Sequence, residues 1–200
     1  GDLISAECTL LRGVPMRFQS LNHSVLLLVF TFGVCDAQVR LTPAQADSLC
    51  RAAEAHIRDD RPEEAVAVLQ VVIGAGFERA EIYVLFGHAS LSAEDRKGAR
   101  AAFEKGIKLG AKAEGYNGLG LAYLDEGDEQ HARSNFRRAV DKDPTFVDAH
   151  YNLALIYEKS RPSKAMDAFE RVVELDARHR EAHYRMGRLL EEKREWRIFS

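Results

Sequence analysis

Large apolar side chains recur three and four positions apart through most of the chain after residue 42, with charged residues between them. This spacing is the period of an α-helix that buries one face. Thr42 and Gln45 form a capping box around Pro43, and Gly127 occupies a position suited to the end of a helix. The pattern therefore predicts an all-α chain with nine helices, near residues 43–58, 62–74, 79–92, 95–109, 113–126, 129–141, 146–159, 162–175 and 179–196.

One arrangement of large and small residues repeats along these predicted helices. Copies begin near Leu49, Tyr83, His150 and His183, and the copy at His150 is one residue short before Ala165. Small residues fall where the two helices of one copy must cross closely, at roughly 8 to 10 Å between their axes. Self-similarity of this kind indicates stacked helical units. The clearest copy consists of Tyr116, Leu119, Gly120, Tyr123, Ala132, Phe136, Ala139 and Pro144.

This pattern resembles the tetratricopeptide repeat, with Tyr116 in the place where that family usually has Trp. The resemblance implies a right-handed α-solenoid of about four and a half helix-turn-helix repeats, whose first helices line a concave groove. In this family the groove usually binds an extended or helical segment of another protein. The units fall near residues 46–79, 80–112, 113–146 and 147–179, with a partial unit at 180–200.

The resemblance also transfers the groove-facing positions of each unit. In the unit that starts at Ala113, these positions hold Glu114, Asn117, Gly118, Leu121, Leu124 and Asp125. Over the last three units the same positions carry more acidic than basic residues, which favours a neutral or basic partner segment. The candidate partner-binding residues are Asn117, Leu121, Tyr151, Asn152, Leu155, Tyr184, Arg185 and Arg188.

Some tetratricopeptide domains hold a C-terminal carboxylate with a clamp of Lys, Asn and Arg side chains. Asn152 and Arg185 match two elements of that clamp by position, but Glu181 replaces a Lys, so the clamp is incomplete. The Asn152 amide can still donate and accept hydrogen bonds, and the Arg185 guanidinium can bind a carbonyl or carboxylate oxygen. Tyr151 and Tyr184 would add large contact surfaces beside them.

A secretory signal peptide is predicted at residues 16–37. Arg17 supplies its positive charge, an apolar run follows at residues 25–35, and Cys35 and Ala37 supply the small residues before the cut. The run is shorter than the roughly 20 apolar residues of a membrane-spanning helix. We therefore expect cleavage after Ala37 and no stable membrane insertion after signal cleavage. A lipoprotein and a buried hydrophobic helix are the alternative interpretations.

The segments around the signal peptide lack this organisation. Residues 1–15 show no helical or strand period and are expected to be an untranslated or disordered extension, whereas residues 38–45 form a short lead-in to the repeats. Export, with only Cys50 left after cleavage, points to the bacterial periplasm or cell envelope.

Composition and spacing narrow the chemistry further. The chain has 200 residues and a formal net charge of -3, so it lacks the basic surface of a general nucleic-acid binder. His179 and His183 are one helical turn apart, but their repeat positions explain them by packing and no HExxH motif is present. The basic residues of the predicted helix at 129–141 resemble a solvated face. We expect no catalytic group, no metal and no other cofactor.

Two functions remain from the sequence. The first is a non-catalytic protein-protein interaction scaffold of the cell envelope, which binds a partner segment in the concave groove. The alternative is the recognition arm of a longer exported enzyme whose catalytic domain lies beyond residue 200. The chain begins with Gly1, which favours a fragment, and the helix that contains Trp196 is either a polar cap or the first half of a further unit.

Overall fold

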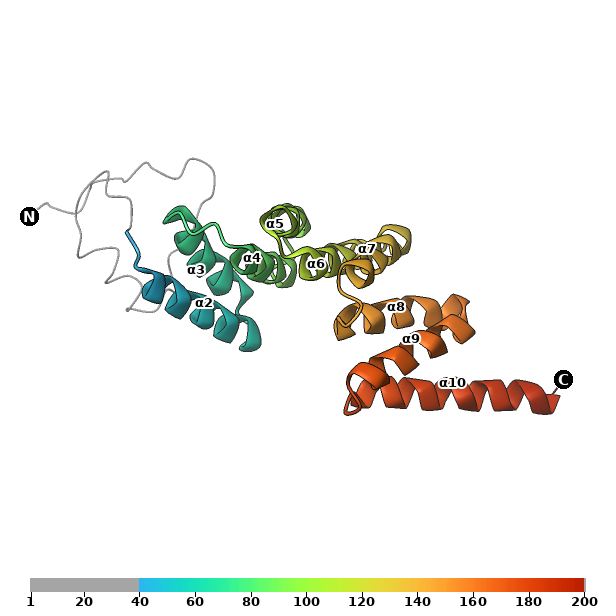
Figure 1. The fold of residues 1–200 in the computed structure, drawn as a ribbon. Helices are drawn as coiled ribbons and strands as arrows, with labels where there is room; N and C mark the ends of the chain where they lie inside the picture. The colour runs from blue at the N-terminus through green and yellow to red at the C-terminus, as the bar shows by residue number, and fades with distance from the viewer. Residues whose placement is uncertain (1–39, 200) are drawn as a thin grey trace, which may run out of the picture. The chain divides into compact units, whose positions relative to one another are not determined.

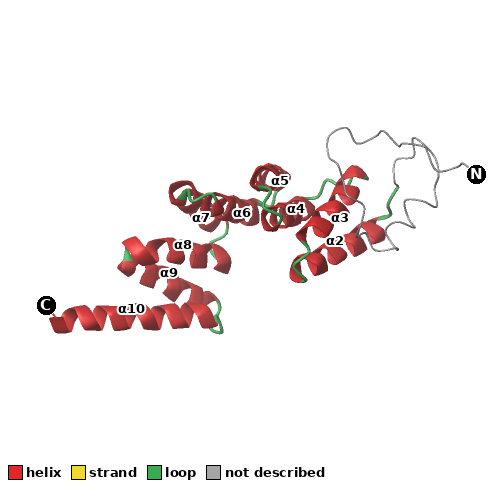
Figure 2. Cartoon of the chain, turned by 180° about the vertical axis from the view of Figure 1, so that it is seen from behind, coloured by secondary structure: helices red, strands yellow, loops and turns green. Residues whose placement is uncertain are grey.

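The computed structural model describes residues 40–199, with side chains up to residue 192 (Figure 1). The expected extension at residues 1–15, the signal peptide at residues 16–37 and the side chain of Trp196 lie outside the described residues. Every regular element in the described part is a helix, which confirms the all-α prediction (Figure 2). The helices are α2 (Pro43–Arg58), α3 (Pro62–Gly74), α4 (Ala80–Ser92), α5 (Arg96–Leu109), α6 (Lys112–Asp125), α7 (Glu129–Lys142), α8 (Val147–Ser160), α9 (Pro162–Leu175) and α10 (Arg180–Phe199).

Helix boundaries follow the local signals in the sequence. The Gln45 N–H donates to the Thr42 hydroxyl, and the Thr42 N–H donates to the Gln45 side chain, so the predicted capping box is formed. Asp95 and Asp128 accept hydrogen bonds from backbone N–H groups at the starts of α5 and α7. Gly127 has φ of 79°, a left-handed conformation that glycine adopts without strain. All observed boundaries lie within one residue of the predicted ones except the end of α10, which is longer.

Consecutive helices pack as pairs, α2 with α3, α4 with α5, α6 with α7 and α8 with α9, and α10 packs on α9. The copy at His150, which is one residue short in the sequence, has a shorter turn between its two helices. Residues 126–128 separate α6 from α7, whereas Arg161 alone separates α8 from α9. Helices α6 and α8 are both 14 residues long, so the shorter copy changes the turn and not the helix length.

A phenylalanine on the second helix of each of three units forms the centre of its core. Phe103, Phe136 and Phe169 have no exposed surface. Gly120 on α6 lies directly against the Phe136 ring, and a Cβ atom at that position would overlap it. Gly87 faces Phe103 in the same way. The small residues therefore permit the close helix crossing that the repeat pattern predicts.

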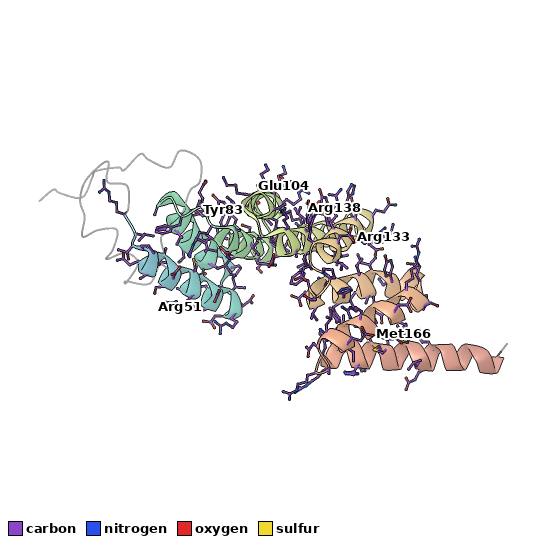
Figure 3. The ribbon with its side chains drawn as sticks, viewed as in Figure 1. Arg51, Tyr83, Glu104, Arg133, Arg138 and Met166 are labelled. Carbon is purple, nitrogen blue, oxygen red and sulfur yellow. The ribbon has the colours of Figure 1, made fainter. Side chains whose placement is uncertain are left out.

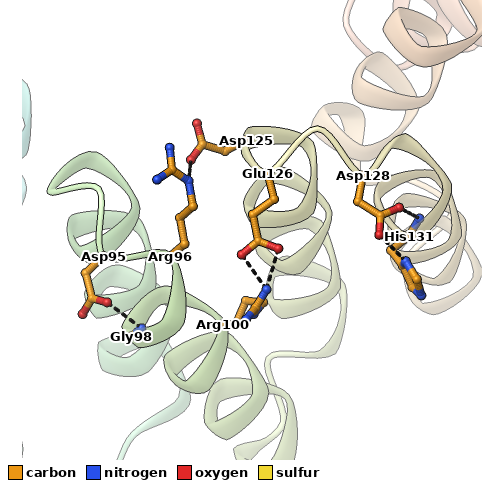
Figure 4. A network of polar contacts seen from close by, with 8 residues as sticks. All are labelled: Asp95, Arg96, Gly98, Arg100, Asp125, Glu126, Asp128 and His131. Atoms are coloured by element: carbon orange, nitrogen blue, oxygen red, sulfur yellow. Dashed lines mark hydrogen bonds and ion pairs between the residues drawn. The ribbon is translucent and has the colours of Figure 1, made fainter.

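Contacts between units combine packing with surface ion pairs. Phe103 of one unit also lies against Gly118 of the next, where a Cβ atom would overlap it. On the exposed side, Arg96 and Arg100 of α5 form ion pairs with Asp125 and Glu126 at the end of α6 (Figure 4). Exposed pairs of this kind contribute about 0 to 1 kcal/mol each, so the buried contact dominates the stacking of units.

One residue of the expected basic face of α7 packs against another helix. Arg133 and Arg138 both belong to this helix (Figure 3). The guanidinium carbon of Arg138 lies 5.8 Å from the centre of the Tyr116 ring on α6, at cation–π distance. Arg138 thus covers the aromatic residue that replaces the usual Trp of the repeat.

The glycine on α6 provides the first prediction. Gly120→Leu should destabilise the protein by about 1 to 3 kcal/mol, because the larger side chain overpacks the crossing with Phe136. Gly187→Leu on α10 is the matched control, since nothing lies within 4 Å of a Cβ atom there. That variant should be unchanged or slightly more stable, because leucine is the better helix former. Urea unfolding of both variants measures the difference, and equal stabilities would contradict the assigned crossing.

Candidate functional site

A pocket of about 390 Å³ lies on the first helices of three consecutive units. Helices α4, α6 and α8, which are separated in the sequence by α5 and α7, thus contribute to one surface. Helix α4 supplies Val84 and His88, helix α6 supplies Glu114, Asn117 and Leu121, and the start of α8 supplies Phe146, Asp148, Tyr151 and Asn152.

The lining follows the repeat. Glu114 and Asp148 occupy the same position of successive units, as do Asn117 and Tyr151. Because equivalent residues of stacked units point to the same side, the pocket collects the groove-facing positions of its three units. Phe146 is the exception, since it is the residue that precedes α8.

Two asparagine side chains join the second and third units of the pocket. Asn152 Nδ2 donates a hydrogen bond to Asn117 Oδ1 over 2.9 Å. Asn117 is only 6% exposed, yet among the described residues its Nδ2 group has no hydrogen-bond partner and is not closed off from solvent. The pair therefore presents an unused amide donor on one residue and an unused amide acceptor on the other, the groups that complement a peptide backbone.

His88 forms the wall of the pocket on α4. Its ring lies edge-on against Phe103, with 5.1 Å between the ring centres. Burial lowers the pKa of His88 below its ordinary value of 6.5, and the negative charge of Asp148 opposes this shift. His88 is therefore predominantly neutral at pH 7.

Four of the eight candidate residues from the sequence lie together in this pocket. They are Asn117, Leu121, Tyr151 and Asn152. The other four lie elsewhere: Leu155 packs against the core that surrounds Phe169, Tyr184 is 62% exposed on α10, Arg185 is held by carboxylates, and Arg188 pairs with Glu192 over 3.3 Å.

Arg185 differs most from its expected environment. Its Nη1 donates to Glu158 over 2.6 Å and its Nε donates to Glu181 over 3.1 Å. Both acidic residues are groove-facing positions of their units, so the guanidinium is already used within the chain. Gly118, also expected in the groove, is buried against Phe103.

Val84 and His88 are pocket residues that were not predicted, because the groove positions were assigned only in the last three units. The same rule applied to the unit that starts at Ala80 would have found both. Phe146 carries no such signal, since it lies in the connection before α8.

No helix among residues 40–199 combines the length and apolar character needed to cross a bilayer. Over the same residues, no three His, Cys, Asp or Glu side chains gather as a metal site would require.

The fold and the site define a helical-repeat protein with a pocket on the first helices of its units. A family model of the TPR repeat matches residues 120–160, and one of the tetratricopeptide repeat matches residues 148–177. Together the two matches cover residues 120–177, and they agree with the resemblance seen in the sequence. No curated protein sequence compared with the chain matches it.

Solved structures share the same fold. PilF of Pseudomonas aeruginosa matches with a TM-score of 0.66 and 17% identity, over 76% of this chain and 70% of PilF. TTC0263, a thermophilic TPR protein of Thermus thermophilus, matches with a TM-score of 0.66 and 14% identity, over 74% of this chain and 83% of its own. YrrB, described as a TPR protein with an unusual peptide-binding site, matches with a TM-score of 0.54 and 22% identity, over 70% of this chain and 73% of its own. At these identities the likeness establishes the fold of this chain.

The environment of His88 predicts how stability depends on pH. Because the pKa of His88 is lowered in the folded protein, the unfolded chain takes up the proton first as the pH falls below 6.5. The stabilising contribution is thus complete above pH 6.5 and is lost as the pH falls through the lowered pKa. His88→Leu, which introduces the residue found at this repeat position in Leu121, should lose less stability than the wild type between pH 7.5 and 5.5, two assay values chosen to span that range. Urea unfolding at both pH values tests this, and an equal loss in both proteins would contradict it.

Proposed function

We propose that this chain is a non-catalytic protein-protein interaction scaffold that binds a segment of a partner protein in the groove formed by α4, α6 and α8. The observation that carries the proposal is the pocket lined by equivalent positions of three successive units. Tetratricopeptide proteins are in general binding modules, and the structurally similar YrrB is a TPR protein with an unusual peptide-binding site. These findings support a protein or peptide as the ligand.

The unused donor and acceptor of the Asn117 and Asn152 pair suit an extended backbone, because a peptide group offers one acceptor and one donor. Tyr151 and Phe146 line the same pocket and supply apolar contact area for side chains of that segment. Affinity would come from the buried aromatic contacts, whereas orientation would come from the amides.

The cell envelope is the proposed location, and it rests on the sequence of residues 16–37 alone. Expression in a bacterial host should give a mature chain that begins at Gln38. Ala37→Asp should abolish this cleavage, because signal peptidase requires a small residue before the cut. N-terminal sequencing of both products tests the expectation. A wild-type product that keeps residues 16–37 and remains in the cytoplasm would contradict export.

The recognition arm of a longer exported enzyme remains the alternative prediction, and it would use the same groove. Both functions require that the pocket binds a peptide segment, so one experiment addresses the binding step common to them.

Asn152→Ala should weaken peptide binding about tenfold, because it removes an amide acceptor from the pocket and the hydrogen bond that orients Asn117. Peptides selected from a random display library on the wild-type chain serve as ligands, and isothermal titration calorimetry gives their dissociation constants. The matched control is Gln70→Ala, which removes an exposed amide from α3, outside the pocket.

The control variant should bind as the wild type does. Thermal unfolding of both variants confirms that each remains folded at the temperature of the titration. Equal affinity of the Asn152→Ala variant and the wild type would remove the pocket from consideration, and failure of the wild type to select any peptide would reject the proposed function.

A further inference from the structure

The charged residues that line the pocket are all acidic. Its lining contains two carboxylates, Glu114 and Asp148, and no lysine or arginine. Both carboxylates are exposed, and neither has an ion-pair partner among the described residues. By contrast, Glu181, at the same repeat position of α10, is paired with Arg185. Two negative charges in the pocket are thus left without compensation.

The positive charge beside Tyr151 is compensated within the chain. Arg185 interacts with Tyr151, but it is bonded to Glu158 and Glu181, so this group of three side chains carries a net negative charge. Negative charge also occurs at the equivalent position of the preceding unit. Glu81 occupies on α4 the position that Glu114 and Asp148 occupy on α6 and α8.

The remaining walls are neutral and aromatic. Burial raises the pKa of the Tyr151 phenol, so Tyr151 is uncharged at neutral pH. Burial lowers the pKa of His88, whose neighbours are Phe103 on α5 and the carboxylate of Asp148 on α8. Because His88 is predominantly neutral, it does not offset the two carboxylates. The faces of Tyr151 and Phe146 can in turn contact a cation favourably.

Asn117 adds a hydrogen-bond donor to the charged lining of the pocket. Asn117 is more than nine-tenths buried, lines the pocket and keeps an unpartnered amide donor there. The amide group is not closed off from solvent, so an acceptor that enters the pocket can reach it. This donor would bind a carbonyl oxygen of the segment that carries the charged side chain.

We propose that the pocket binds one positively charged side chain, lysine or arginine, of an extended partner segment, with Glu114 and Asp148 as its counter-ions. This inference rests on the proposed function, because it names the chemistry of the segment that the groove binds. An acidic side chain at that point of the segment is excluded, because it would face two like charges.

Selection from a random peptide display library tests the proposal with three proteins: the wild type, the double variant Glu114→Gln with Asp148→Asn, and a control. The control is Asp167→Asn with Glu170→Gln, two exposed residues of α9 outside the pocket. Both double variants change the net charge equally, so general electrostatic attraction affects them alike. The expected result is enrichment of Lys or Arg at one fixed peptide position by the wild type and the control, and loss of this preference in the pocket variant.

A second measurement requires no change in the protein. The most enriched arginine peptide is compared with the same peptide carrying citrulline, which has a similar shape and no charge. The citrulline peptide should bind the wild type about tenfold more weakly. Equal affinity of the two peptides, or an equal loss of preference in pocket and control variants, overturns the charged-side-chain proposal. Peptides recovered without any preference for Lys or Arg would also overturn the charged-side-chain proposal, but they would leave the proposed function intact. Recovery of no peptide by the wild type would reject the proposed function and the charged-side-chain proposal together.

Discussion

The close crossing of two helices within each unit is the contact on which the rest of the structure depends. In the α4–α5 and α6–α7 units, a glycine of the first helix faces a fully buried phenylalanine of the second at this crossing, as Gly120 faces Phe136. The contact fixes the rotation of α6 about its axis as well as its distance from α7. With Gly120 held against the ring, the helical period directs Asn117 and Leu121 to a different face, where they line the pocket.

Phe103 shows how one side chain organises two levels of structure. Its ring fills the crossing with Gly87 in its own unit and lies against Gly118 of the next unit. The same burial therefore stabilises the pair and sets the stacking of successive first helices. Ion pairs such as Arg100 with Glu126 lie at the edge of this stack, where solvent limits what they contribute. Apolar packing thus sets the geometry of the pocket and leaves polar side chains in its lining.

Sequence reasoning predicted the helices closely because their signals are local. The apolar period, the Thr42 capping box and Gly127 each act within a few residues. Four of the eight predicted binding residues lie together in the pocket, since residues such as Asn117 and Tyr151 follow from a fixed position in each unit. Sequence reasoning failed where a side chain depends on another unit. Gly118 is buried by Phe103, and Arg185 is bound by Glu158 from the preceding first helix, and neither contact has a signal in the local pattern.

The location of the pocket links binding to the stability of the stack. Asn117 and Asn152 belong to different units, and their hydrogen bond crosses the boundary between α6 and α8. A ligand that contacts both residues binds only when the two units are stacked, so its binding free energy adds to the free energy of that interface. In a repeat protein, where each unit is stabilised mainly by its neighbours, such a ligand opposes separation of the units at the place where it is bound. A partner held on a single unit would have no such effect. Binding at the pocket, as proposed, would therefore be coupled directly to the stacking of the units.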